Sequence, residues 1–289
     1  MSKYSKQKLK MKRWIKILII IFILILISCS VFLALFGFKN NIIKENINYD
    51  AKEVSDNIAI NSMPIIINNI IAGATYDKKW VSSQRYFLNS KNKVDTEIDI
   101  YNKKGKAGTF VIKNIKQDTS QVYVQTTNMN LSNEFVAVAK NSIDLMQSFA
   151  LTSNIVEYDY KIAKKALGLY RIFNPSINIL NAYDVVLKGG ELGRILIVTN
   201  QKGKSTGAYS SVIFVDQNNN VDLIKYSYVK NLDNAALWSV YSLMFVVDLN
   251  ADGINEIILQ ETKEFDVKYS IIEYKNNKFS EVLSTEIKI

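Results

Sequence analysis

The sequence predicts a mainly β (α+β) fold with one helix in its exported part, placed behind an N-terminal transmembrane helix. Three observations predict this architecture. Residues 17–38 are uncharged and mostly apolar. Residues 79–127 alternate between polar and apolar side chains, as half-buried strands do. The last third of the chain contains a repeat of about 60 residues, and each copy offers four short strands.

The residue content excludes several classes of enzyme and metal site. The chain of 289 residues has no histidine and one cysteine. Without histidine there is no Ser-His-Asp triad, no Cys-His dyad and no imidazole metal ligand. One cysteine allows neither an intrachain disulfide nor a thiolate zinc site. Any metal site must therefore rely on oxygen ligands.

The net charge of +9 is concentrated in the first 39 residues. This segment holds eight of the 36 Lys and Arg residues and no Asp or Glu, which leaves 28 basic against 27 acidic residues in the rest. Only four of the cations are arginines, the residue best suited to reading base edges and phosphates. We therefore expect no nucleic-acid partner.

The N-terminal segment predicts a basic cytoplasmic tail over residues 1–16 and a transmembrane signal anchor over residues 17–38. At about 1.5 Å per residue, the apolar stretch spans about 33 Å, enough for the hydrocarbon core of a bilayer. A cleaved secretory signal has a shorter apolar region of about 7–15 residues. The preceding positive charges keep the N-terminus inside. We therefore expect a single-pass protein of the cell membrane with an extracellular body.

Cys29 leaves a second interpretation of this segment open. Leu26-Ile27-Ser28-Cys29 resembles a bacterial lipoprotein box, whose cysteine is lipidated and becomes the first residue of the mature protein. Lipoproteins normally turn polar soon after this cysteine, whereas here the apolar run continues to Phe38. The uncleaved anchor is the favoured interpretation and the lipoprotein is the alternative. Both interpretations place the body outside the membrane.

The exported part divides into a juxtamembrane stalk, a small β module and a C-terminal β-repeat domain, over residues 39–75, 76–130 and 131–289 respectively. Trp80, Tyr86 and Phe87 are expected in the core of the β module, because large aromatic side chains are mostly buried. An apolar stripe with helical spacing predicts a helix over residues 155–168, packed on the β structure.

The β-repeat domain contains two similar units. Val186–Ile197 aligns with Asp248–Leu259, and Val212–Asn218 aligns with Ile271–Asn277 further along. Each unit offers a strand that enters a loop, a strand that leaves it and then a hairpin. This pattern is typical of a four-stranded antiparallel meander that resembles a propeller blade. Two units cannot close a propeller, so we expect them to pack against each other.

The loop of the second unit carries the most specific motif in the chain, Asp248-x-Asn250-x-Asp252-Gly253-Ile254-x-Glu256. Ca²⁺ takes about six to eight oxygen ligands, and alternate side chains of a tight loop point inward together. We predict side-chain oxygens from Asp248, Asn250 and Asp252, the carbonyl of Ile254, and the Glu256 carboxylate directly or through water. The alternative is an ordinary Asn/Asp/Gly turn between strands.

This motif matches an EF-hand loop over nine positions. Leu259 stands where an EF-hand has its bidentate glutamate, however, and a strand follows instead of a helix. The combination resembles the calcium loops of FG-GAP and VCBS-type β repeats. Across residues 76–289 the chain looks similar to bacterial exported proteins of uncharacterised function with a membrane anchor, a small Trp-containing β module and paired Asp-rich repeats. The resemblance implies a β-repeat fold and a structural calcium, and it implies no reaction.

The first repeat unit lacks the ligands of the second. Its residues at the four side-chain ligand positions are Val186, Lys188, Gly190 and Arg194. Two of these residues are cationic and none offers a carboxylate or amide oxygen. We therefore expect this loop to bind no metal.

A non-enzymatic binding or scaffold role is the function that the sequence favours, with a cell-envelope glycan or protein as its partner. The alternative is a lipoprotein-type cell-envelope hydrolase, or an accessory of such an enzyme, that uses carboxylates. Asp95, Glu97 and Asp99 are acids of an alternating strand, and Asp159 lies on the predicted helix. We expect all four on solvated faces, so we assign no catalytic residue and no cofactor besides calcium.

Labelled palmitate distinguishes the two interpretations of the N-terminal segment. An uncleaved anchor predicts that cells expressing the full chain incorporate no label at Cys29. Label that is present in the wild type and lost in Cys29→Ala would contradict the anchor and establish the lipoprotein. Label that persists in Cys29→Ala would exclude lipidation at this position.

Overall fold

The computed structural model describes residues 62–88, 94–103, 105–118, 121–126, 134–140, 150–169, 176–187, 191–200, 208–229 and 238–288. The expected tail, anchor, lipidation site at Cys29 and most of the stalk lie outside these residues. Across the described ranges, no helix is both long enough and apolar enough to span a bilayer. These ranges form sixteen strands, all paired antiparallel, and two helices. The prediction of a mainly β fold is confirmed.

The first sheet closes into a six-stranded barrel. Its strands are β1 (Met63–Ile67), β2 (Ile70–Tyr76), β4 (Glu97–Asn102), β5 (Gly105–Asp118), β6 (Gln121–Thr126) and β7 (Val136–Ala139). The strand order β1-β7-β4-β5-β6-β2 returns to β1, because β1 pairs with both β7 and β2. Strand β3 (Lys79–Ser82) extends β2 outside the ring, and helix α3 (Ser83–Leu88) follows it.

Local turn chemistry supports the first two hairpins of the barrel. Asn68 and Asn69 join β1 to β2, and Asp77 and Lys78 join β2 to β3, all four with positive φ. Two-residue hairpins of this kind need positive φ at both central positions, which Asn and Asp tolerate well. The barrel interior is filled by apolar side chains, among them Ile66, Ile71, Tyr86, Ile98, Ile100, Ile112 and Val122.

The barrel extends beyond the β module expected over residues 76–130. The apolar run assigned to the end of the stalk forms β1 and β2, and β7 closes the ring after residue 130. Closure depends on the pairing of β1 with β7, which lies about 70 residues away in the chain. Tyr86 is buried inside the barrel and Phe87 packs against its core, as predicted. Trp80 instead packs against a different apolar cluster, on the outside of the barrel.

The two repeat units are four-stranded antiparallel meanders, as the sequence predicts. Strands of the first unit are β9 (Ile177–Val186), β10 (Leu192–Asn200), β11 (Ala208–Asp216) and β12 (Val221–Val229), with β8 (Leu151–Ser153) added at the edge. Strands of the second unit are β13 (Val240–Val247), β14 (Glu256–Thr262), β15 (Asp266–Lys275) and β16 (Lys278–Lys288).

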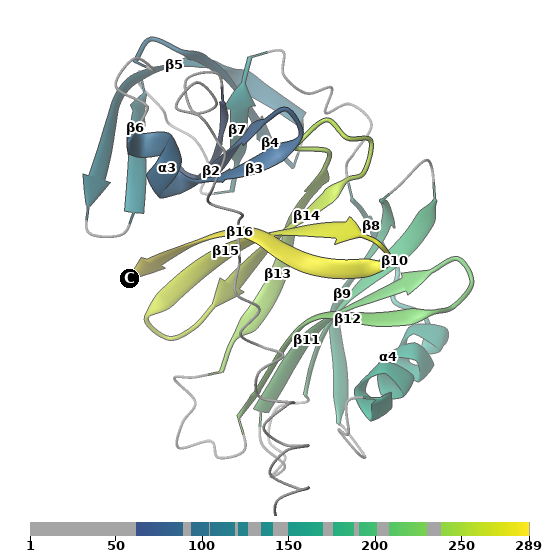
Figure 1. The fold of residues 1–289 in the computed structure, drawn as a ribbon. Coiled ribbons are helices and arrows are strands. Elements are labelled where there is room, and N and C mark those ends of the chain that lie inside the picture. Colours follow the sequence, from purple (N-terminus) through teal and green to yellow (C-terminus); the bar gives the residue numbers. More distant parts are fainter. Residues whose placement is uncertain are drawn as a thin grey trace, which may run out of the picture. The chain divides into compact units, whose positions relative to one another are not determined.

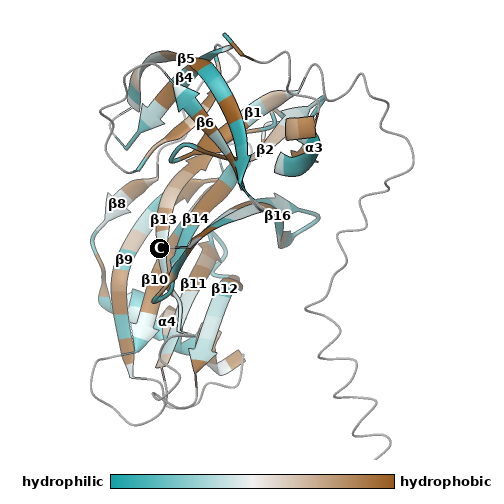
Figure 2. Ribbon diagram, turned by 90° about the vertical axis from the view of Figure 1, so that its left-hand side faces the viewer, coloured by the Kyte–Doolittle hydropathy of each residue, from teal (hydrophilic) through white to brown (hydrophobic). Residues whose placement is uncertain are grey.

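The two meanders pack face to face and share one apolar core. Ile195, Ile197 and Val212 of the first unit lie in the same cluster as Ile257 and Leu259 of the second. The expectation that the units pack against each other is therefore confirmed. Hydropathy colouring shows apolar residues along β13, β14 and β10 (Figure 2). Such near-continuous apolar runs indicate strands that are covered on both faces.

The outer face of each meander has its own cover. Helix α4 (Glu157–Leu169) lies against the five-stranded sheet (Figure 1), where Ile162, Ala166 and Leu167 meet Leu196 and Ile213. The prediction of a helix over residues 155–168 is thus confirmed to within two residues at its start. The outer face of the four-stranded sheet shares an apolar cluster with the barrel, which includes Ile65, Val136, Met244, Ile258 and Ile271.

Arg194 attaches helix α4 to the first meander. Its guanidinium donates from Nε and Nη2 to the two carboxylate oxygens of Asp159, both at 2.8 Å, and from Nη1 to Asp184 at 2.6 Å. Asp159 is only 1% exposed and also accepts from the amide of Val156, just before the helix, at 2.8 Å. The expectation that Asp159 lies on a solvated face is wrong, because a non-local arginine compensates its charge.

Replacement of Arg194 by methionine is expected to destabilise the fold by about 3–5 kcal/mol, because it leaves the buried Asp159 carboxylate without its cation. Urea unfolding of the full chain in detergent measures this loss. Lys161→Met is the matched control, since Lys161 forms an exposed ion pair with Glu157 on the same helix. The control is expected to cost less than about 0.5 kcal/mol. Equal losses in the two variants would contradict the assignment.

A second ion cluster lies at the interface of the two meanders, where Glu281 of β16 pairs with Lys225 of β12 and Lys268 of β15. Burial acts to raise the pKa of Glu281, but the two lysines outweigh it and lower the pKa to about 2. The ionised carboxylate therefore stabilises the fold at pH values above its ordinary pKa of 4.5.

This stabilisation is lost as the pH falls from about 4.5 toward about 2, where Glu281 becomes protonated. We expect unfolding stability to decrease less steeply over this pH range in Glu281→Gln than in the wild type. Urea midpoints at a series of acidic pH values measure the two slopes. Parallel pH profiles would contradict a lowered pKa at Glu281.

Candidate metal centre

The predicted calcium loop connects β13 to β14 and is folded by its own side chains. The Asp248 carboxylate accepts from the amides of Asp252 and Gly253, at 3.1 and 2.9 Å. The side-chain oxygen of Asn250 accepts from the Asp252 amide at 3.0 Å, and Asp252 accepts from the Ile254 amide at 2.9 Å. Gly253 has a φ of 88°, so the tightest position of the loop requires glycine.

These bonds bring the predicted side-chain ligands into one short loop. Each carboxylate oxygen has two acceptor positions, so a single amide bond leaves it able to bind an ion as well. Asn250 is buried, whereas Asp248, Asp252 and Ile254 are partly exposed. The loop therefore offers one protected amide oxygen and carboxylates that remain accessible to solvent ions.

Glu256 is the most unusual residue of the loop. Its side chain is fully buried at the first position of β14. Oε2 accepts from the amide of Leu249 at 2.7 Å, which turns the carboxylate toward the loop. Oε1 is buried and accepts no hydrogen bond from any described residue. An orphan buried carboxylate oxygen is costly, and it requires either a proton or a cation.

The electrostatic surroundings of Glu256 are entirely acidic. Burial raises the pKa of Glu256 to about 9, and the nearby charges of Asp248 and Asp252 add to this effect. Among the described residues, no Lys or Arg forms an ion pair with any of these three carboxylates. A divalent cation would supply the missing positive charge, and hard oxygen donors are the ligands that Ca²⁺ prefers.

The oxygen atoms of these residues are the kind of ligand that Ca²⁺ prefers, but the side chains are not yet arranged around one point. Within the ranges that the structure describes, no three acidic side chains are arranged as a ready metal site. Binding would therefore require the side chains of Asp248 and Asp252 to reorient toward Glu256. Rotation of partly exposed carboxylates is inexpensive, and the backbone turn and the buried Glu256 are already in place.

The loop is held in place by the first repeat unit. Asn255 donates from its amide to the carbonyl of Leu187 at 2.6 Å, and from its side chain to the carbonyl of Val186 at 2.7 Å. These carbonyls belong to the last residue of β9 and to the residue that follows it, where the first unit begins its own loop. This contact was not predicted from the sequence. Asn255 occupies a position of the motif that has no ligand role, so the motif gave no reason to single it out.

One further acid near Glu256, Glu273, was not predicted from the sequence. Glu273 of β15 is 7% exposed and accepts a hydrogen bond from Nε1 of Trp80 at 3.1 Å. Its charge also acts to raise the pKa of Glu256. In the sequence, only one feature marks Glu273 as unusual: it is an acid within an otherwise apolar strand, Ile271-Ile272-Glu273-Tyr274.

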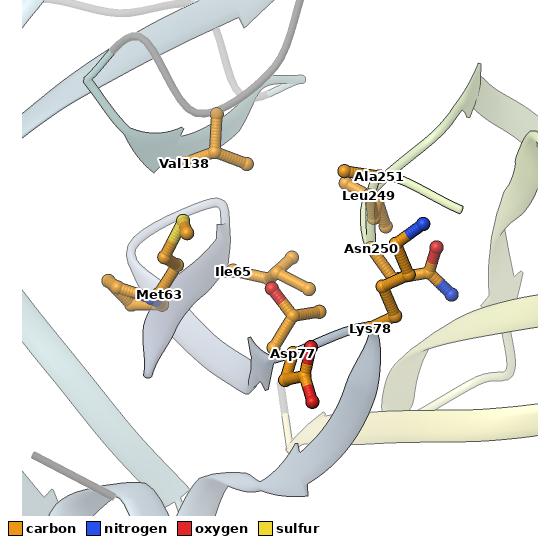
Figure 3. A pocket seen from close by; sticks show the side chains of 10 residues that line it. Met63, Ile65, Asp77, Lys78, Val138, Leu249, Asn250 and Ala251 are labelled. Atoms are coloured by element: carbon orange, nitrogen blue, oxygen red, sulfur yellow. The ribbon is translucent and has the colours of Figure 1, made fainter. Parts of the chain in front are cut away.

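A small cavity of about 230 Å³ adjoins the loop. Met63, Ile65 and Val138 of the barrel line one side, and Leu249, Asn250 and Ala251 of the loop line the other (Figure 3). Asp77 and Lys78 of the β2–β3 turn give it a polar end. Small-molecule sites usually measure about 300–1,000 Å³, so this cavity suits only a small apolar group.

The acids of β4 do not form a catalytic pair. Asp95, just before β4, and Glu97 are exposed and pair with Lys113 and Lys140, as expected for a solvated face. Asp99 is buried instead, where it accepts from Thr109 at 2.6 Å and pairs with Lys106 at 2.8 Å. The expectation of solvent exposure is wrong for Asp99, whose charge is compensated by these neighbours.

Comparisons of the chain with protein-family models, with curated proteins and with solved structures found no match. The loop between β13 and β14 and its surroundings are therefore the features that indicate a function. The observation with the clearest chemical meaning is the buried carboxylate of Glu256.

Proposed function

We propose that the exported part of the chain is a calcium-stabilised binding or scaffold module without enzymatic activity, held at the outer surface of the cell membrane by residues 17–38. The observation that carries this proposal is Glu256, a fully buried carboxylate with an orphan oxygen beside Asp248 and Asp252. A cation in the loop satisfies that oxygen and neutralises its acidic neighbours.

Calcium is the ion that fits this environment best. The donors are carboxylate, amide and carbonyl oxygens, with neither histidine nor thiolate among them. Extracellular calcium modules function with dissociation constants of about 10⁻⁴–10⁻³ M, so a loop with few rigid ligands suffices. The likeness of the motif to FG-GAP and VCBS-type loops supports the same ion and a structural role for it.

The burial of the acids favours a structural role over the alternative of a carboxylate hydrolase. A catalytic carboxylate must reach its substrate, whereas Glu256 is fully buried. Asp99 is likewise buried and paired with Lys106, and Glu97 pairs with Lys140. None of these acids lines the cavity beside the loop.

A pair of tyrosines favours a binding role for the first meander. Tyr226 and Tyr228 of β12 are 38% and 44% exposed, and their rings lie parallel with centroids 6.4 Å apart. Exposed tyrosines give a rigid contact surface with a polar edge, which suits glycan rings and protein interfaces. We therefore propose a cell-envelope glycan or protein as the partner.

Calcium binding is tested by isothermal calorimetry and thermal unfolding of the full-length chain in detergent. We expect one calcium ion per chain in the wild type, and at least about tenfold weaker binding in Asp252→Ala. Calcium at about 100 times its dissociation constant is expected to stabilise the wild type by about 2.7 kcal/mol, because the ion binds only the native loop.

Asp216→Ala is the matched control for this experiment. Asp216 shapes the β11–β12 turn by accepting from the amides of Asn218 and Asn220 at 2.8 and 2.7 Å, in a turn without a calcium motif. The control is expected to lose stability and to retain calcium binding. Equal calcium affinity in the wild type and Asp252→Ala would contradict the site and leave the loop as an ordinary turn.

A further inference from the structure

Two buried acids face each other across neighbouring strands of the second meander. Strands β14 and β15 are antiparallel, and Ile257 pairs with Ile272. The next position of this ladder places Glu256 opposite Glu273, on the same face of the sheet. Glu256 is fully buried and Glu273 is 7% exposed. Side chains directly opposite each other in a sheet have Cβ atoms about 4.5–5.5 Å apart, within reach of a shared ligand.

Like charges in this arrangement destabilise a sheet unless something compensates them. Ion pairs between described residues include neither Glu256 nor Glu273. The first meander avoids the problem, because Arg194, which aligns with Glu256, pairs with the apolar Val215 on the neighbouring strand. An acid thus lies opposite another acid in the second unit, whereas an arginine lies opposite a valine in the first.

Glu273 is fixed in orientation by the barrel. Its Oε1 accepts from Nε1 of Trp80 on β3, and Trp80 packs against the apolar cluster shared by the barrel and the outer face of the second meander. A carboxylate has about four acceptor positions, so this bond leaves acceptor capacity on Glu273 for a second partner. A cation between the two strands would use this capacity and would also satisfy the orphan oxygen of Glu256 on the neighbouring strand.

We propose that Glu273 is a further ligand of the cation held by the Asp248–Glu256 loop, which makes the site an assembly of two strands instead of a single loop. This inference rests on the proposed calcium function. The bound ion would be a hard divalent or trivalent cation. Trp80 would lie next to the coordination shell, because it donates a hydrogen bond to Glu273. Cation binding is thereby linked to the contact between the barrel and the second meander.

The test uses terbium, a luminescent substitute for calcium, added to the full-length chain in detergent. We expect Glu273→Gln to raise the terbium and calcium dissociation constants by about tenfold, because one charged ligand is lost. Glu286→Gln is the matched control, since Glu286 is an exposed acid on β16 of the same sheet. The control is expected to leave both dissociation constants unchanged.

Trp80 provides a second and independent measurement. The chain has three tryptophans, and terbium bound at Glu273 is expected to take most of its sensitised emission from Trp80. Trp80→Phe should therefore lose most of the emission excited through tryptophan, while calorimetry still detects terbium binding. This measurement keeps the inference testable if Glu273→Gln fails to fold.

The outcomes separate this inference from the proposed function. Calcium binding that is unchanged in Glu273→Gln, or tryptophan-sensitised emission that is unchanged in Trp80→Phe, would overturn the role of Glu273 and leave a loop-only site. Absence of any cation binding to the wild type would overturn both. Weakened binding in Glu273→Gln together with lost emission in Trp80→Phe would support the two-strand site.

Discussion

Both meanders of this protein are apolar on their two faces, and this constraint determines how the described elements pack. The inner faces cover each other through a shared core that includes Ile197 and Ile257. Helix α4 packs on one outer face, and the outer face of the second meander shares its apolar cluster with the barrel. Any charged residue under such a cover loses its hydration, so it must find a partner of opposite charge.

The two repeat units meet this requirement differently at corresponding positions. In the first unit, Arg194 supplies the cation, and Asp159 and Asp184 compensate it within 2.8 Å. In the second unit the corresponding residue is Glu256, and its neighbours Asp248, Asp252 and Glu273 are acidic as well. The same fold therefore contains one charge cluster that is complete and one that lacks a cation. This contrast between aligned positions adds to the evidence of the orphan Glu256 oxygen for an ion in the second loop.

Features set by local sequence could be predicted, whereas features set by distant contacts could not. The meanders, helix α4 and the Asp248–Glu256 loop follow from alternation, helical spacing and a glycine turn, all readable within a few residues. Barrel closure depends on the pairing of β1 with β7, and the Glu273–Trp80 bond joins residues 193 positions apart. Asp159 looked solvated for the same reason, because the arginine that pairs with it lies 35 residues away.

A crystal structure of the calcium-loaded protein, with the ion identified by anomalous scattering, is the decisive measurement. We expect one ion in the loop between β13 and β14, about 2.3–2.6 Å from oxygens of Asp248, Asn250, Asp252 and Glu256. Oε1 of Glu256 would then no longer be an orphan. A map from calcium-saturated crystals without ion density there, with Glu256 hydrogen-bonded to Glu273 through a shared proton, would contradict this expectation.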